Sequence, residues 1–129
     1  MKIYVCVKHV PDTAARITIL ENHRIDERVT FIMNPYDENA IEEAARIKDE
    51  FGDAEIIAVT LGGQTAEATL QSALAMGADR GILIKTEHPL DSMISAAALK
   101  AAIESDGKPG LIFTGKESID SEGFQTMYR

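Results

Sequence analysis

Tryptophan is absent from this 129-residue chain, cysteine occurs once, and only 5% of the residues are aromatic. Because Cys6 has no partner for an internal disulfide, the fold must be held by its core, and a reducing compartment is expected, the cytoplasm in the first place and an organellar matrix as the alternative. So few aromatic rings provide little surface on which nucleic-acid bases could stack. No charged leader with an apolar core and no apolar run of membrane-spanning length occurs, so we expect no membrane insertion.

Positive charge is also scarce. The chain has 13 lysine and arginine residues against 21 acidic ones, which gives a formal net charge of −8. This balance argues against nucleic acid as a partner, because a phosphate backbone binds basic surfaces. A small phosphate ligand stays possible, since backbone N–H groups and one or two lysines can make a single pocket positive.

Several motifs of known chemistry are missing. No G-x-G-x-x-G follows the first apolar run, and neither G-x-x-x-x-G-K-[ST] nor G-x-S-x-G occurs, which excludes conventional NAD, P-loop and hydrolase sites. The histidines, His9, His23 and His88, lack metal-ligand spacing, so no metal site is predicted. Cys6 lies in an apolar run without an acid-base partner and is predicted to be a buried small hydrophobe. No catalytic residue is therefore assigned.

Strand and helix patterns alternate along the chain. Apolar, β-branched runs predict strands at residues 2–8, 54–61, 80–85 and 111–114, and patterns of 3.6-residue period predict helices at 34–51, 64–76 and 91–104. Residues 16–20 and 28–33 predict a small hairpin insertion. The order predicts a doubly wound, mostly parallel α/β sheet of Rossmann-like, nucleotide-binding type, with strand order 3-2-1-4. Residues 1–129 are expected to form a single domain.

The polar stretch after the fourth strand is the predicted binding site. Strand order 3-2-1-4 places residues 6–9 beside residues 115–120, at the edge where open α/β sheets bind ligands. Lys116 could reach a phosphate or be an ordinary solvated lysine. Ser118, Ser121, Thr126 and the N–H groups of residues 123–125 could cradle a phosphate or simply cap a helix that begins near Gly123. Asp120 could accept from a ribose hydroxyl or be a turn residue.

Four segments together resemble one family. They are Val5-Cys-Val-Lys-His-Val-Pro-Asp12, Asn34-Pro-Tyr-Asp-Glu-Asn-Ala-Ile-Glu-Glu-Ala-Ala-Arg46, Ala73-Leu-Ala-Met-Gly-Ala-Asp-Arg80, and Gly115-Lys-Glu-Ser-Ile-Asp120 with Gln125-Thr126. The chain resembles the N-terminal part of the electron-transfer flavoprotein beta subunit over essentially its whole length. A helix start near residue 123 without a stop also fits the N-terminal part of a longer subunit.

The resemblance implies an electron carrier rather than an enzyme. It implies a heterodimer with an alpha subunit, an FAD shared at their junction, and electron donors of the acyl-CoA dehydrogenase type. It also implies an adenine nucleotide in the beta subunit, either AMP or a second FAD, and the choice between them stays open. The implied nucleotide-binding residues are Cys6, Asn34, Pro35, Tyr36, Asp37, Leu61, Gly115, Lys116, Glu117, Ser118, Ile119, Asp120, Ser121, Glu122, Gly123, Phe124, Gln125 and Thr126.

A different class of function competes with this one. The same sheet could belong to a stand-alone ATP-binding, stress-type sensor domain without a redox role. Such a domain is expected to bind ATP by itself and to form a closed fold without further strands.

Overall fold

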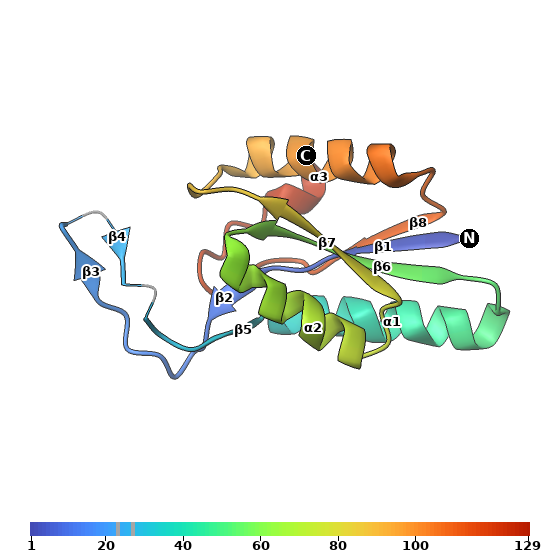
Figure 1. The fold of residues 1–129 in the computed structure, drawn as a ribbon, viewed down its shortest axis with the longest axis horizontal. Coiled ribbons are helices and arrows are strands. Elements are labelled where there is room, and N and C mark those ends of the chain that lie inside the picture. Colours follow the sequence, from blue (N-terminus) through green and yellow to red (C-terminus); the bar gives the residue numbers. More distant parts are fainter. Residues whose placement is uncertain (23, 27) are drawn as a thin grey trace.

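The computed structural model describes residues 1–22, 24–26 and 28–129. At its centre is a sheet of four parallel strands in the order β7-β6-β1-β8 (Figure 1). The strands are β1 (Lys2–Cys6), β6 (Glu55–Gly62), β7 (Arg80–Lys85) and β8 (Leu111–Thr114). The four strands expected from the sequence were numbered 1 to 4 along the chain, and they correspond to β1, β6, β7 and β8. In that numbering the observed order is 3-2-1-4. An α/β fold with a parallel central sheet is confirmed.

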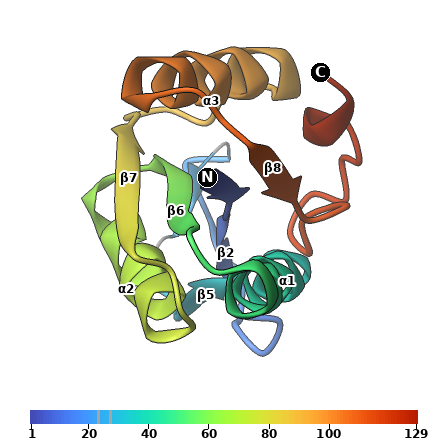
Figure 2. The same ribbon diagram turned by 90° about the vertical axis from the view of Figure 1, so that its right-hand side faces the viewer.

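Helices cover both faces of the sheet (Figure 2). On one face lie α1 (Pro35–Phe51) and α2 (Glu67–Ala75), the latter preceded by the short 3₁₀ helix η1 (Gln64–Ala66), and on the other lies α3 (Ser92–Asp106). Ile3 and Val5 pack toward α1 and α2, whereas Tyr4, between them, packs toward α3. This alternation follows from the two-residue period of a strand. Of the helices that the structure describes, none is long and apolar enough to span a membrane.

The expected pairing of residues 16–20 with 28–33 is wrong. The strand β5 (Phe31–Met33) pairs instead with β2 (His9–Pro11), and β3 (Ile19–Leu20) pairs with β4 (Arg24–Ile25). Val10 and Met33 are buried in the β2–β5 pair, so burial of apolar side chains outweighs the local hairpin. The β3–β4 hairpin projects away from the body (Figure 1). His23, which was expected within the hairpin turn, lies outside the described residues, as does Glu27.

The α-helix expected from Gly123 is also wrong. Residues 115–125 form turns and irregular backbone, and only a short 3₁₀ helix, η2 (Thr126–Tyr128), follows. Glu122 and Phe124 have φ values of 46° and 54°, in the left-handed region that an α-helix does not use. No α-helix N-terminus is therefore available at residues 123–125 to bind a phosphate.

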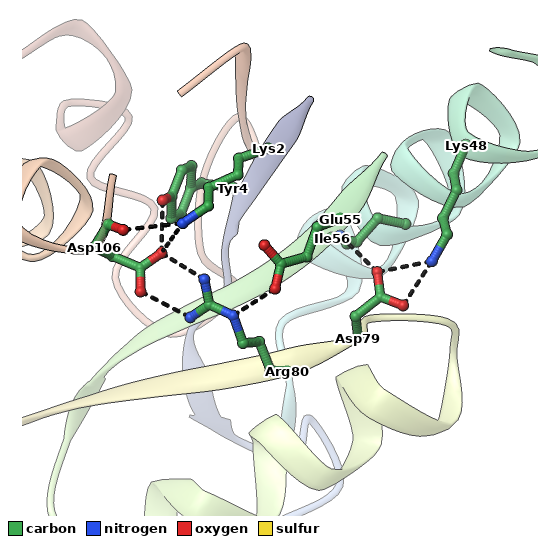
Figure 3. Close-up of polar contacts among 8 residues, drawn as sticks. All are labelled: Lys2, Tyr4, Lys48, Glu55, Ile56, Asp79, Arg80 and Asp106. Atoms are coloured by element: carbon green, nitrogen blue, oxygen red, sulfur yellow. Dashed lines mark hydrogen bonds and ion pairs between the residues drawn. The ribbon is translucent and has the colours of Figure 1, made fainter. Parts of the chain in front are cut away.

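A charged network fixes the sheet at the opposite, amino end (Figure 3). Asp106, the last residue of α3, accepts hydrogen bonds from the Tyr4 hydroxyl (2.7 Å) and from the Arg80 guanidinium (2.6 and 2.8 Å). Arg80 also pairs with Glu55 at 2.7 Å. These contacts join β1, β6, β7 and α3, so the amino edge is closed by side-chain contacts.

Candidate functional site

A groove of about 1600 Å³ opens at the carboxyl edge of the sheet. Most of the predicted site residues line it: Cys6, Asn34, Asp37, Leu61, Gly115, Lys116, Glu117, Ser118, Asp120, Ser121, Gly123, Phe124, Gln125 and Thr126. Four others do not: Pro35, Tyr36, Ile119 and Glu122. The groove thus gathers segments that are about 80 to 120 residues apart in the chain, as expected at the carboxyl ends of parallel strands.

Asp37, in the first turn of α1, joins the ends of two strands. One carboxylate oxygen accepts from the backbone N–H of Lys8 at 2.8 Å, and the other accepts from the N–H of Gly115 at 3.0 Å. Burial of Asp37 raises the pKa of its carboxyl to about 6, although these hydrogen bonds act in the opposite direction. Asp37 therefore holds β1, β8 and α1 in one arrangement at the groove.

Asn34 shapes the loop that follows β8. It occupies the N-cap position of α1, but its side chain makes no capping hydrogen bond. Its Nδ2 donates to the backbone carbonyl of Glu117 at 2.7 Å, and its Oδ1 accepts from the N–H of Ile119 at 3.0 Å. These long-range bonds outweigh local capping because they satisfy backbone groups of a loop that has no regular structure. The Asn34 amide thus fixes the loop conformation.

Gly115 lies where the strand, the loop and α1 come closest. A Cβ atom at this position would overlap the carboxylate of Asp37 and press on the backbone and Cβ of Tyr36. Any larger residue would therefore separate β8 from the start of α1. The glycine allows the backbone approach that the Asp37 hydrogen bond requires.

An ion pair between Lys8 and Asp120 closes the side of the groove next to β1. The Lys8 ammonium lies 2.7 Å from Asp120 Oδ1, 3.1 Å from Ser118 Oγ and 3.4 Å from Ser121 Oγ. The two serine hydroxyls are 2.8 Å apart. The proximity of residues 6–9 to residues 115–120, expected from the sequence, is confirmed by these contacts.

Lys116 is directed toward aromatic rings. Its Nζ lies 4.8 Å from the centre of the Tyr36 ring and 5.8 Å from that of Phe124, within cation–π range. It also pairs with Glu117 at 3.4 Å, and this interaction raises the pKa of Lys116. The ammonium therefore has partners in its own loop and at the start of α1.

Cys6 is the last residue of β1, and it lines the groove at the end of this strand. Burial, reinforced by the charge of Asp37, raises the pKa of the thiol to about 12. The thiol therefore stays neutral at physiological pH and is a poor nucleophile. Among the described residues, no group of three histidine, cysteine, aspartate or glutamate side chains is placed to hold a metal ion.

Comparison with known proteins shows the family to which the chain belongs. A sequence model of the electron transfer flavoprotein domain matches residues 23–127. The chain belongs to the electron transfer flavoprotein family.

Relatives in this family are similar over nearly the whole chain. It is 41% identical over 128 residues to the electron transfer flavoprotein subunit beta of Dictyostelium discoideum, covering 98% of this chain and 51% of the relative. It is 42% identical over 128 residues to the mitochondrial subunit beta of Arabidopsis thaliana, with the same coverage. Against the acryloyl-CoA reductase electron transfer subunit gamma of Anaerotignum propionicum, identity is 37% over 130 residues, covering 97% and 48%. The chain thus spans about half the length of these relatives.

Several residues that line the groove were not among the site residues predicted from the sequence. The side chain of Lys8, the glycines Gly62 and Gly63, and residues 86–90 also line it. Each lies at or just after the carboxyl end of a parallel strand, so the rule that ligands bind at those ends could have indicated all three. Residues along most of α3, from Ser92 to Glu104, also line the groove, which only the packing of α3 on the sheet could reveal.

Proposed function

We propose that this chain is the nucleotide-binding part of an electron-transfer flavoprotein subunit of the beta type. In this proposal the groove binds AMP, or the AMP half of a second FAD. With an alpha subunit and a shared FAD, the complete protein carries electrons from dehydrogenases of the acyl-CoA type to an acceptor. The subunit acts as a carrier, and none of its residues is assigned to bond-making chemistry.

The observation that carries the proposal is the construction of the loop 115–121. The buried side chains of Asn34 and Asp37 bind the loop backbone at three points, at Gly115, Glu117 and Ile119. A loop fixed in this way beside the end of β1 lies where open parallel sheets bind nucleotides. Family membership supports the same function, because the similar relatives are named as electron transfer subunits.

The site itself has the character expected for an adenine nucleotide. Apolar groups at the ends of β1 and β6, among them Cys6 and Leu61, can contact a base, while Lys8, Ser118 and Ser121 offer donors for a phosphate. A mostly apolar wall with a few oriented polar groups is typical of cofactor sites. A cytoplasmic location, expected from the single cysteine, belongs to the same proposal.

The test is the nucleotide content of the complete protein. The full-length subunit, produced with its alpha subunit and freshly purified, is denatured, and the released nucleotides are separated and quantified. One FAD and one AMP per heterodimer support the AMP form of the proposal, and two FAD support the form with a second flavin. A preparation that releases neither AMP nor flavin contradicts the proposal. Strong ATP binding by a subunit that forms no heterodimer would instead favour the stand-alone sensor.

A further inference from the structure

Lys8 is the first charged side chain after the central strand β1. This strand lies between β6 and β8, so its carboxyl end is at the middle of the groove. The backbone N–H of Lys8 is held by Asp37 at 2.8 Å. The side chain therefore extends into the groove from a fixed backbone position.

One carboxylate and two hydroxyl groups surround the Lys8 ammonium. The ammonium contacts Asp120 Oδ1 at 2.7 Å and both serine hydroxyls, at 3.1 and 3.4 Å. The hydroxyl of Ser118 also hydrogen bonds to Asp120, and together with Lys8 it lowers the pKa of that carboxyl against the effect of burial. A lysine with neighbouring hydroxyl donors is a set of groups that suits a phosphate as well as a carboxylate.

Lys116, the lysine that was a candidate for phosphate binding from the sequence, has different surroundings. Its ammonium faces the rings of Tyr36 and Phe124 and pairs with Glu117. The hydroxyls of Ser118 and Ser121 are instead grouped around Lys8. Lys8 thus has the supporting donors for an anion in its immediate surroundings.

We infer that Lys8 recognises the phosphate of the adenine nucleotide and that Asp120 is the carboxylate which this phosphate displaces. The inference rests on the proposed function, because it assigns roles within the same groove. A nucleotide phosphate carries up to two negative charges and three terminal oxygens, so it is a stronger partner for Lys8 and the hydroxyls than a carboxylate.

The exposure of the ion pair permits this exchange. The side chains of Lys8 and Asp120 are 45% and 29% exposed, so an incoming ligand can reach both. An ion pair at the surface contributes little to stability, so its loss on ligand binding does little harm to the fold. Asp120 nevertheless competes with the phosphate, and removing its charge should strengthen phosphate binding. Adenosine, which has no phosphate, should be insensitive to both residues.

The test compares AMP with adenosine on the full-length subunit after bound nucleotide has been removed. Dissociation constants are measured by calorimetry for the wild type, Lys8→Gln and Asp120→Asn. The controls are Lys108→Gln and Asp49→Asn, which remove the same charges at exposed positions that do not line the groove.

The expected pattern depends on the phosphate. Lys8→Gln weakens AMP binding roughly tenfold or more, the effect of losing one charge-assisted hydrogen bond. Asp120→Asn strengthens AMP binding about threefold or more, since the ammonium is then free of its competing charge. Both variants change adenosine binding less than about twofold, and the controls change neither ligand. In ³¹P NMR of bound AMP, Lys8→Gln raises the pKa of the phosphate, a change that a purely structural role would not produce.

Each contrary result has a separate meaning. AMP binding by Lys8→Gln that equals the wild type overturns the assignment while leaving the proposed function intact. Equal losses for AMP and adenosine overturn it as well, because they show that Lys8 supports the fold of the groove only. Weaker AMP binding in Asp120→Asn overturns the displacement of this carboxylate. A wild type that binds neither AMP nor adenosine overturns this inference, and it overturns the proposed function as well if the complete protein also releases neither AMP nor flavin.

Discussion

At the scale of single residues, the groove depends on buried polar groups whose partners are backbone atoms. Asn34 is 1% exposed and Asp37 is 6% exposed, and each binds backbone groups from distant segments. The side chains that are free to reach a ligand come instead from the loop and from Lys8. The resemblance implies that Asn34 and Asp37 contact nucleotide, and the structure gives both a second task, that of positioning the loop.

Gly115 offers a test of this close packing. Gly115→Ala places a methyl group against the Asp37 carboxylate and the Tyr36 backbone, so we expect the free energy of unfolding to fall by about 1–3 kcal/mol, as for other overpacked sites. Nucleotide retention should fall with it. The measurement is urea unfolding of the full-length subunit.

Gly63→Ala is the matched control for Gly115→Ala. A Cβ atom at Gly63 meets nothing within 4 Å, and the backbone there is extended, with φ of −73°. Its effect should stay within roughly 0.5 kcal/mol, as is usual for surface substitutions. Equal stability losses in the two variants would contradict the special role of Gly115.

At the scale of secondary-structure elements, the two ends of the sheet are held differently. At the carboxyl edge the start of α1 binds β1 and β8 through Asp37 (2.8 and 3.0 Å). At the amino edge the end of α3 binds β1 and β7 through Asp106, with charged partners (Figure 3). A second pair, Lys48 with Asp79, joins α1 to the turn before β7, where Asp79 also accepts from the N–H of Ile56 at 2.7 Å. The sheet can therefore keep its carboxyl edge open without losing its connection to the helices.

Asp106→Asn should weaken the amino edge. The fully buried Tyr4 loses the carboxylate that accepts the hydrogen bond of its hydroxyl group. The Arg80 guanidinium loses a charged partner to which it donates two hydrogen bonds. We expect the free energy of unfolding at pH 7 to fall by about 1–2 kcal/mol, a value reduced for the partial exposure of the pair. Urea unfolding measures the change.

Glu104→Gln serves as the control for Asp106→Asn. Glu104 belongs to the same helix and pairs with Lys100 at 3.9 Å, but both side chains are largely exposed. Such a pair contributes little, so its loss should change stability by less than about 0.5 kcal/mol. If the Asp106 variant is as stable as this control, the network does not hold the amino edge.

At the scale of the whole molecule, two carboxyl groups whose pKa values shift in opposite directions affect how stability depends on pH. The pKa of Asp37 is raised from 3.8 to about 6 by burial, so in the interval between these values the folded state binds a proton that the unfolded state does not. Its contribution to stability is present at low pH and is lost as pH rises through 6. The pKa of Asp106 is lowered, chiefly by its hydrogen bonds with Arg80, so its contribution is present above the unfolded value and is lost on acidification.

Asp37→Asn should remove the contribution of Asp37 to the pH dependence of stability. Between pH 7 and pH 5 the wild type should gain about 1 kcal/mol of stability relative to Asp37→Asn, because only the wild type takes up the extra proton on folding. The variant should be less stable than the wild type at both pH values, since an amide cannot accept both backbone hydrogen bonds. Urea unfolding at the two pH values gives the difference. Parallel pH dependences in the two proteins would contradict the raised pKa.

The sequence by itself determined the family, the α/β class and the long elements. Strands such as β7 and β8 and the helix α1 carry periodic apolar patterns, and their local chemistry and their tertiary packing favour the same structure. Short polar segments lack such a pattern, and so the pairing of β2 with β5 and the turns after Gly115 were predicted incorrectly or not at all. Burial of Val10 and Met33 favours the pairing of β2 with β5. Left-handed backbone at Glu122 and Phe124 produces turns in place of the expected helix.

For the candidate site too, the sequence indicates its place in the chain, and the tertiary structure decides the roles of its side chains. Its place at residues 115–126 follows from strand order, which the sequence indicates through the alternation of strands and helices. The roles of individual side chains depend on contacts across more than 100 residues, such as Lys8 with Asp120, and on which polar groups are already bound to backbone. Such contacts leave no periodic signal in the sequence, because a hydrogen bond depends on distance and direction in space. Only the tertiary structure therefore distinguishes Lys8, which lies beside Ser118 and Ser121, from Lys116, which faces aromatic rings.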